Sequence, residues 1–364
     1  MKILRDYVLK EFFHSFLLSV VVFTFVLLVG NIIQLADLVI NKGVGLFSVL
    51  KLFFFLIPWL LSFTLPIAAL TGVILTFGRF SGDGELTAIK ASGIGLFKIS
   101  SPLLILGIIF SVIAFYMNDQ VSPNASFASR RVVKEIGMRN PSAMLEEGTF
   151  IRGFGNYVIF IYEIKKNKFR NIRIYQPQEG KTTRTIIAES GEINTQPGTS
   201  IVELKLFNGT SEEPSPTEPE SFYKLNFKTY NMTIDVSKLL KKEKIDKKIR
   251  EMTVSELRKE IESVSAQKMD TTPLYVEIYK KINMSVASFV LILMGIPLGI
   301  KAQRSEKSIG FGISLLLFAV YWGAFLGGIA MSLRGTVPAL LGVSIPNAVF
   351  FIFGLVLFIH TARR

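Results

Sequence analysis

Four long stretches of this sequence carry no charged residue, and they limit the folds open to the chain more than any other feature. They cover residues 15–33, 52–77, 285–300 and 338–359. A helix needs roughly 20 apolar residues to cross the hydrocarbon core of a bilayer, so these stretches predict membrane-spanning helices. Half of the 364 residues are hydrophobic and only 19% are charged, as expected for a polytopic α-helical membrane protein.

The hydropathy pattern predicts six spans, at about residues 13–36, 48–78, 97–118, 274–300, 308–333 and 337–360. The second stretch exceeds one perpendicular helix, because some 30 residues rise about 45 Å. Pro58 and Pro66 indicate a kinked or tilted helix that emerges from the membrane, and the alternative is a re-entrant pair. The first stretch is too long for the apolar core of a cleavable signal peptide.

Basic residues predict the orientation of the spans. One set of helix ends carries Lys2, Arg5, Lys10, Arg79, Lys90, Lys98, Lys301, Arg304, Lys307, Arg363 and Arg364, whereas the opposite short loops carry Lys42, Lys51 and Arg334. The positive-inside rule therefore places both termini in the cytoplasm. The expected layout is an N-terminal membrane half (1–118), an external domain (119–273) and a C-terminal membrane half (274–364).

Composition excludes several other classes of protein and site. The net charge of +13 does not indicate nucleic-acid binding, because a membrane protein gathers Lys and Arg at its cytoplasmic edges and the rest lie in a charged connector at 238–250. The absence of Cys excludes disulfides and thiolate metal sites. His14 and His360 are too far apart in sequence to suggest a metal centre, so we expect no metal site.

The sequence of the external domain predicts β-strands. Residues 156–164, 171–176, 184–189, 200–209 and 222–234 are rich in β-branched and aromatic side chains and are separated by turn-forming segments. This spacing predicts an all-β, jelly-roll-like domain. The apolar row on one face of the strands is either the core of the domain or a surface that holds acyl chains between partly open sheets.

Two further segments in the external region have patterns of their own. Residues 178–183, QEGKTT, resemble the end of a phosphate-binding loop, but Tyr175 stands where the first glycine is required and a strand follows. The chain therefore has no nucleotide-binding loop of this type. Residues 238–268 form a charged connector, in which Thr253 and Glu256 fit a capping box at the start of a helix.

The pieces together resemble a known family. Six predicted spans are interrupted after the third by a β-domain, and the loop between spans two and three reads ELTAIKASGI (85–94). LEEGTF (145–150), MTVSEL (252–257), GIPLGI (295–300) and Pro123 also match family motifs. In order and spacing, the chain resembles the LptF/LptG (YjgP/YjgQ) permeases of the lipopolysaccharide exporter.

This resemblance implies a function and a set of partners. The chain would be a non-catalytic permease subunit in a bacterial inner membrane, with its β-domain in the periplasm. It would pair with a second LptF/LptG-type subunit and bind an LptB-like cytoplasmic ATPase dimer, which holds the ATP and Mg²⁺, so no cofactor is expected on this chain. Lipopolysaccharide would pass through the β-domain and an LptC-like bitopic protein to an LptA-like periplasmic bridge.

The polar stretch GDGELTAIKASG (82–93) would be the coupling helix. Asp83 could cap it, Gly93 could end it, and Glu85 would lie in its first turn, where the helix dipole favours a carboxylate. The resemblance implies that Leu86 and Ile89 contact the ATPase and that Glu85 meets a basic group there. The alternative is a well-capped cytoplasmic turn with no partner.

Basic residues near the outer ends of the spans are the candidates for binding lipid phosphate. They are Lys280, Lys281, Lys42, Lys51 and Arg130. For the lysines of span four, membrane anchoring with Glu277 as a partner is the equal alternative. Gly323 and Gly327 form a small-xxx-small pair in span five, where the choice is between packing inside the subunit and an interface between subunits.

Two other functions remain open from the sequence. One is a membrane subunit of another ABC assembly, for lipoprotein release or mechanotransmission, which typically has four spans with the external domain after the first. The other is an ion-coupled lipid transporter, which would need ionisable residues buried in mid-span. The sequence does not distinguish an F-type from a G-type subunit, a homodimer from a heterodimer, or one lipid from another.

Overall fold

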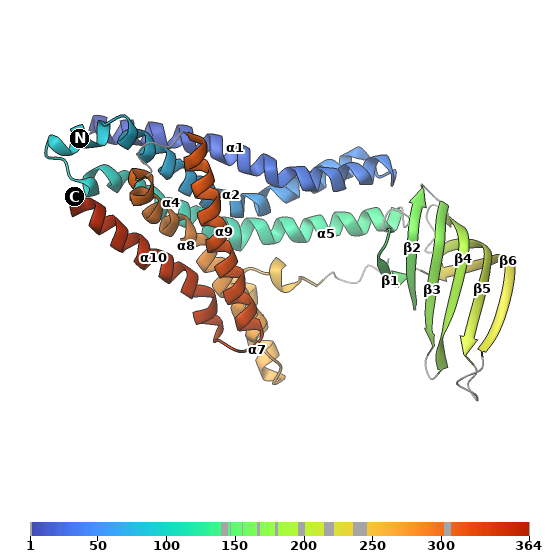
Figure 1. Cartoon of the computed structure of the whole chain (residues 1–364). Helices are drawn as coiled ribbons and strands as arrows, with labels where there is room; N and C mark the ends of the chain where they lie inside the picture. Colours follow the sequence, from blue (N-terminus) through green and yellow to red (C-terminus); the bar gives the residue numbers. More distant parts are fainter. Residues whose placement is uncertain are drawn as a thin grey trace. The chain divides into compact units, whose positions relative to one another are not determined.

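A computed structural model describes residues 2–139, 145, 147–154, 156–165, 168–178, 181–195, 201–214, 222–235, 246–301 and 307–363 (Figure 1). The chain divides into two compact units. The helical unit comprises Met1–Asn31, Phe55–Ala128 and Lys247–Arg364, and the sheet unit comprises Ile32–Phe54 and Ser129–Asp246.

The six predicted spans are confirmed as long apolar helices. They are α1 (Lys2–Ile40), α2 (Leu46–Gly82), a continuous helix over Leu96–Gly137, α8 (Thr272–Lys301), α9 (Lys307–Leu333) and α10 (Ala339–Arg363). The third runs through α4 (Leu96–Tyr116), a π-helical segment (Met117–Val121) and most of α5 (Ser122–Arg139). The alternative of a re-entrant pair for the second span is wrong, because α2 continues through both Pro58 and Pro66.

Helix α8 occupies the centre of the helical unit. It packs against α4, α9 and α10, and most of its residues are buried. Two glycines allow it to approach α2 closely: a Cβ on Gly299 would lie 2.8 Å from the carbonyl oxygen of Ile74, and one on Gly295 would lie 3.1 Å from Leu70 Cδ1. Close approach through small residues is typical of helices that pack within a membrane.

The inserted β-domain is confirmed as one six-stranded antiparallel sheet. Its strands, β1 (Phe150–Phe154), β2 (Tyr157–Lys165), β3 (Lys168–Gln178), β4 (Lys181–Thr195), β5 (Ile201–Pro214) and β6 (Phe222–Asp235), follow each other in sequence order across the sheet (Figure 1). The described strands thus form a meander within a single sheet, without the crossing connections between two sheets that a jelly roll requires. Strand β1, which the sequence pattern did not predict, pairs with β2.

One face of the sheet forms the core of the domain. Ile159 and Ile161 of β2, Ile172 and Ile174 of β3, and Leu206 of β5 are all buried. These residues alternate with outward-facing ones, as the period of two in the sequence predicts. In the part of the domain that the structure describes, the apolar row therefore packs against itself.

The connector after the sheet ends in two short helices, η3 (Ile249–Glu251) and α7 (Val254–Ala266). The predicted capping box is confirmed: Thr253 Oγ1 accepts from the Glu256 N–H at 3.2 Å, and Glu256 accepts from the Thr253 N–H at 2.9 Å. Leu257, Leu274 and Ile278 form a small core that joins α7 to the start of α8. The part of the predicted connector at 238–245 lies outside the described residues.

Candidate functional site

A seven-residue helix, α3 (Glu85–Ala91), links α2 to α4 and presents the strongest sequence motif of the chain. Gly84 precedes it with φ of +74°, and Gly93 follows it with φ of +85° and donates its N–H to the Lys90 carbonyl at 2.9 Å. The predicted end at Gly93 is confirmed. The predicted cap at Asp83 is wrong, because Gly84 occupies the N-cap and no side chain caps the helix.

The apolar side of α3 faces the chain's own core. Leu86 is only 4% exposed and belongs to the large hydrophobic cluster of the helical unit, against which Ile89 also packs. In this arrangement Leu86 has no surface to offer a partner, so its assignment to an ATPase contact is corrected to an anchor within the subunit. Lys90 Nζ also donates to the Thr361 carbonyl at 3.2 Å, which ties α3 to α10.

Glu85 is the first residue of α3 and makes its contacts within its own chain. The Tyr7 hydroxyl lies 3.1 Å from Oε1 and 2.9 Å from Oε2 of Glu85, so it donates a hydrogen bond to this carboxylate. Arg79 Nη2 lies 3.7 Å from Oε1. The side chain of Glu85 remains 34% exposed, so a second cation can still reach it.

Arg79, near the end of α2, is the centre of this group. Its Nη1 pairs with Glu11 Oε2 at 3.0 Å, its Nε lies 4.0 Å from Asp83 Oδ2, and its Nη2 donates to the Tyr7 hydroxyl at 2.5 Å. One guanidinium thus faces the carboxylates of Glu11, Asp83 and Glu85. We call Tyr7, Glu11, Arg79, Asp83 and Glu85 the α3 cluster, and its formal charge is one positive against three negative.

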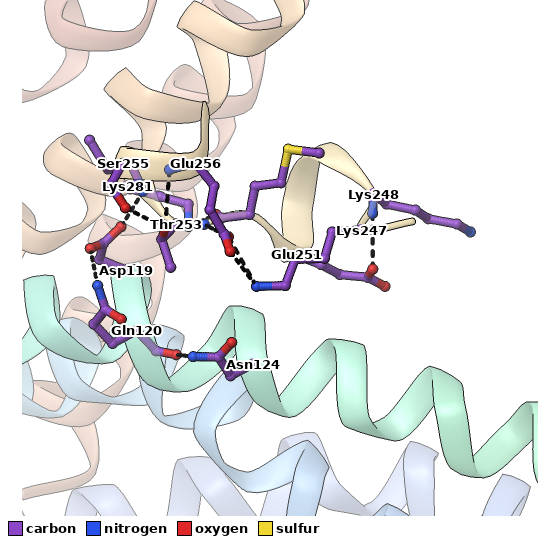
Figure 2. A network of polar contacts seen from close by, with 12 residues as sticks. Asp119, Gln120, Asn124, Lys247, Lys248, Glu251, Thr253, Ser255, Glu256 and Lys281 are labelled. Carbon is purple, nitrogen blue, oxygen red and sulfur yellow. Dashed lines mark hydrogen bonds and ion pairs between the residues drawn. The ribbon is translucent and has the colours of Figure 1, made fainter. Parts of the chain in front are cut away.

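A second polar network joins α8 to the connector and to the π-helical segment (Figure 2). Lys281, 4% exposed, donates from Nζ to the Met252 carbonyl at 2.6 Å and to the Asn118 carbonyl at 3.2 Å. Asp119, 8% exposed, accepts from the Val254 N–H at 2.6 Å and from Gln120 Nε2 at 2.8 Å. Lys281 and Asp119 also interact electrostatically.

Lys247 and Glu256 extend this network toward solvent. Lys247 Nζ donates to both carboxylate oxygens of Glu256, at 2.8 and 3.0 Å (Figure 2). It also lies 5.7 Å from the centre of the Phe127 ring. Burial acts to raise the pKa of Glu256, but hydrogen bonds from Lys247 and Thr253 outweigh it and hold the pKa below its usual range.

The five basic residues predicted to bind lipid phosphate are divided between the two units, and each has a contact within its own unit. Lys281 is buried and satisfied inside the chain, so its assignment to the substrate is corrected to a structural role. Lys280 pairs with Glu277 at 3.1 Å, as the alternative interpretation expected. In the sheet unit, Lys42 lies 3.9 Å from Asp37, Lys51 lies over the Phe47 ring, and Arg130 donates to the Asp246 carbonyl.

The glycine pair of α9 faces open space. A Cβ on Gly323 or Gly327 would meet no atom within 4 Å, so packing of these two residues inside the subunit is wrong. The close contact between α9 and α10 instead uses Gly328 and Gly342, where a Cβ on the former would collide with the carbonyl of the latter. The role of Gly323 and Gly327 at a subunit interface stays a prediction.

Sequence reasoning missed Tyr7, Glu11 and Asp119. The first two lie in the N-terminal end of the long helix that also forms the first span, and Asp119 lies just after the third. The available signal for Asp119 was an acidic residue directly after an apolar stretch, which normally needs a partner when buried. Tyr7 and Glu11 gave no such signal, because polar residues are common at the end of a span.

Comparisons with known proteins agree with this architecture. A sequence model described as "Lipopolysaccharide export system permease LptF/LptG" matches residues 6–360. LptF of Escherichia coli K12 is 21% identical over 216 residues, which cover 57% of this chain and 59% of that protein. An uncharacterized protein of Rickettsia prowazekii is 22% identical over 205 residues, 56% of this chain and 57% of its own length.

The aligned regions thus span somewhat over half the length of these relatives. The family model, in contrast, covers nearly the whole sequence, including all six apolar helices and the inserted sheet. The chain therefore belongs to the LptF/LptG family of lipopolysaccharide export system permeases.

Proposed function

We propose that this chain is a transmembrane permease subunit of an ATP-driven lipopolysaccharide exporter in a bacterial inner membrane. Family membership supports this role, and so does the combination of six apolar helices with an inserted sheet. The chain itself performs no chemistry. ATP and Mg²⁺ are bound by an LptB-like partner ATPase dimer.

The α3 cluster carries the mechanistic part of the proposal. Glu85 and Asp83 lie on a short connection between two spans, at the end of the helices where Lys and Arg predominate. The positive-inside rule supports placing this end, and both termini, in the cytoplasm. An excess of carboxylates at an otherwise basic surface attracts a cationic group, so α3 is the site at which the ATPase engages this subunit.

The sheet unit supplies the proposed path for lipid outside the membrane. Its buried face encloses a small apolar cavity lined by Leu145, Ile159, Ile161, Phe169, Ile172, Ile193, Leu204 and Ile234. Acyl chains enter this face when the strands separate, and the lipid then passes to an LptC-like bitopic protein and an LptA-like bridge. A second LptF/LptG-type subunit completes the membrane part of the exporter.

Copurification tests the proposal. The chain is expressed with its neighbouring membrane subunit and the cytoplasmic ATPase, and the bound lipid is identified by mass spectrometry. We expect a stable complex that contains a phosphorylated glycolipid. Recovery of the membrane subunits without an ATPase or a glycolipid would contradict the proposal and favour an ion-coupled transporter.

Charge reversal at α3 tests the docking site. Glu85→Lys places a second cation beside Arg79, whose Nη2 lies 3.7 Å from the wild-type Glu85 Oε1, and should lower ATPase binding roughly tenfold or more while the chain still inserts in the membrane. Glu85→Gln, which keeps the shape of the side chain, should lower binding less. Glu262→Lys on exposed α7 is the matched control and should bind normally. Normal transport by Glu85→Lys at wild-type abundance would refute the role of Glu85.

A further inference from the structure

The hydroxyl of Tyr7 lies between two of the four charged groups of the α3 cluster, Arg79 and Glu85. It accepts a hydrogen bond from Arg79 Nη2 and donates to the Glu85 carboxylate, whose two oxygens lie 3.1 and 2.9 Å away. Its single proton therefore has a defined direction, away from the guanidinium and toward the carboxylate. Hydrogen bonds to charged groups are stronger than those between neutral groups.

The aromatic ring of Tyr7 also packs against other side chains of the helical unit. It stacks on Phe80 with centroids 5.4 Å apart and an interplanar angle of 18°. Arg79 lies over the same two rings, 5.8 Å from the centre of Tyr7 and 5.4 Å from that of Phe80. Since Phe80 is fully buried, the stack fixes Tyr7 against the core of the helical unit.

These contacts join α1 to α2 and α3, which lie far from it in sequence. Tyr7 and Glu11 belong to α1, Arg79 to α2, and Glu85 to α3. The tight ion pair of Arg79 is with Glu11 at 3.0 Å, whereas its distance to Glu85 is 3.7 Å. The direct hydrogen-bonded contact between α1 and Glu85 is thus the Tyr7 hydroxyl.

We propose that Tyr7 and Arg79 are positioning residues that orient the Glu85 carboxylate and make the end of α1 follow any movement of α3. The Tyr7 hydroxyl holds the Glu85 carboxylate in place for a docking cation and stays bonded to it, while Arg79 stays paired with Glu11. A displacement of α3 is therefore carried to the first span. The link is a property of this chain, and only its use in transport rests on the proposed function.

The absence of Cys from the sequence allows the link to be measured in the isolated chain. Spin labels at Ile3→Cys in α1 and Thr87→Cys in α3, both exposed positions outside the cluster, report the distance distribution between the two helices. Tyr7→Phe keeps the ring on Phe80 and removes only the hydroxyl. We expect Tyr7→Phe to broaden the distance distribution. Tyr116→Phe, at an exposed residue of α4, should leave the distribution unchanged. An unchanged distribution in Tyr7→Phe would overturn the link.

A double-mutant cycle on ATPase binding tests whether Tyr7 acts through Glu85. In the wild-type background Tyr7→Phe should weaken binding roughly fivefold, and in the Glu85→Gln background it should have no further effect. Arg79→Lys keeps the positive charge but loses the planar guanidinium group with its several N–H donors. Its affinity for the ATPase should lie between that of the wild type and that of Arg79→Gln. Equal effects of Tyr7→Phe in both backgrounds would assign Tyr7 to general packing and overturn the proposal.

The two experiments separate the two ideas. If the wild-type chain binds no ATPase, the proposed function fails, while the spin-label distances still decide whether α1 and α3 are linked. If the wild-type chain binds the ATPase and Tyr7→Phe binds equally well, the positioning role fails and the proposed function stands.

Discussion

Replacement of Lys281 by Met should destabilise the helical unit more than any other single loss of charge discussed here. Met preserves most of the apolar stem of Lys281 and removes the ammonium group, which donates to the carbonyls of Met252 and Asn118. Both carbonyls lose a partner, and the buried Asp119 loses a neighbouring positive charge. The substitution therefore leaves uncompensated polar groups in a site that water does not reach.

The contacts set the size of the effect. A hydrogen bond to a charged group contributes about 1.5–3 kcal/mol, and removing one member of a buried charge pair costs about 3–5 kcal/mol. Asp119 keeps its hydrogen bonds from Val254 and Gln120, which places the loss near the lower bound, at about 3 kcal/mol. For a unit of this size each kcal/mol lowers Tm by about 2–4 °C, so Tm should fall by about 6–12 °C.

Thermal unfolding in detergent, followed by tryptophan fluorescence, measures this change. Lys280→Met is the matched control, because Lys280 is the adjacent residue and forms only a partly exposed i,i+3 pair with Glu277. It should cost about 1 kcal/mol or less. Asp119→Asn combined with Lys281→Met should recover part of the stability. Equal shifts for the two lysine variants would refute the conclusion that the buried ammonium stabilises the connector.

Two further predictions concern the connector and the helix contacts. The pKa of Glu256 is depressed in the folded chain, so its stabilisation is complete above its ordinary pKa and disappears as the pH falls through the folded value. Hydrogen exchange of the α7 amides should show Glu256→Gln less protected than wild type at pH 7, and the difference should shrink as the pH falls below the ordinary pKa of a glutamate; a difference that does not change with pH would exclude the carboxylate as its cause. Gly328→Ala should destabilise the chain by about 1–3 kcal/mol because its Cβ meets the Gly342 carbonyl, whereas Gly323→Ala, with nothing within 4 Å, should be neutral in the isolated chain; similar Tm values for both would contradict the described α9–α10 contact.

The elements of this fold could be predicted from the sequence because they depend on local pattern. Uncharged stretches indicate spanning helices, and alternation indicated all strands except β1, which has only five residues and includes a glycine. The order of strands could not be predicted, because alternation shows which face a residue occupies but not which strand lies beside it. Continuous helix through Pro58 and Pro66 likewise depends on packing, which the local sequence does not contain.

The candidate site was predicted only where its residues are adjacent in sequence. Glu85 stands out because it interrupts apolar sequence, and Gly93 because helices commonly end at glycine. The contact of Glu85 with Tyr7 joins residues 78 positions apart, and its contact with Arg79 joins residues 6 positions apart. The hydrogen bond between Val254 and Asp119 joins residues 135 positions apart. Leu86 was assigned to a partner because an apolar residue on a short polar helix fits an interface and a core equally well.

The π-helical segment at Met117–Val121 has a consequence for how this family member tolerates change. A wider turn accommodates one more residue than an α-helix, so the side chains of α5 that follow, from Ser122 to Ala128, are rotated by about 100° from the phase that α4 would give them. Deleting one residue here would restore a regular helix and leave Asn124 and Phe127 on the faces that they now occupy, whereas an α-helical path through all five residues would turn them by about 100°. Natural variation at this segment should therefore include single-residue gaps that convert it to a regular helix.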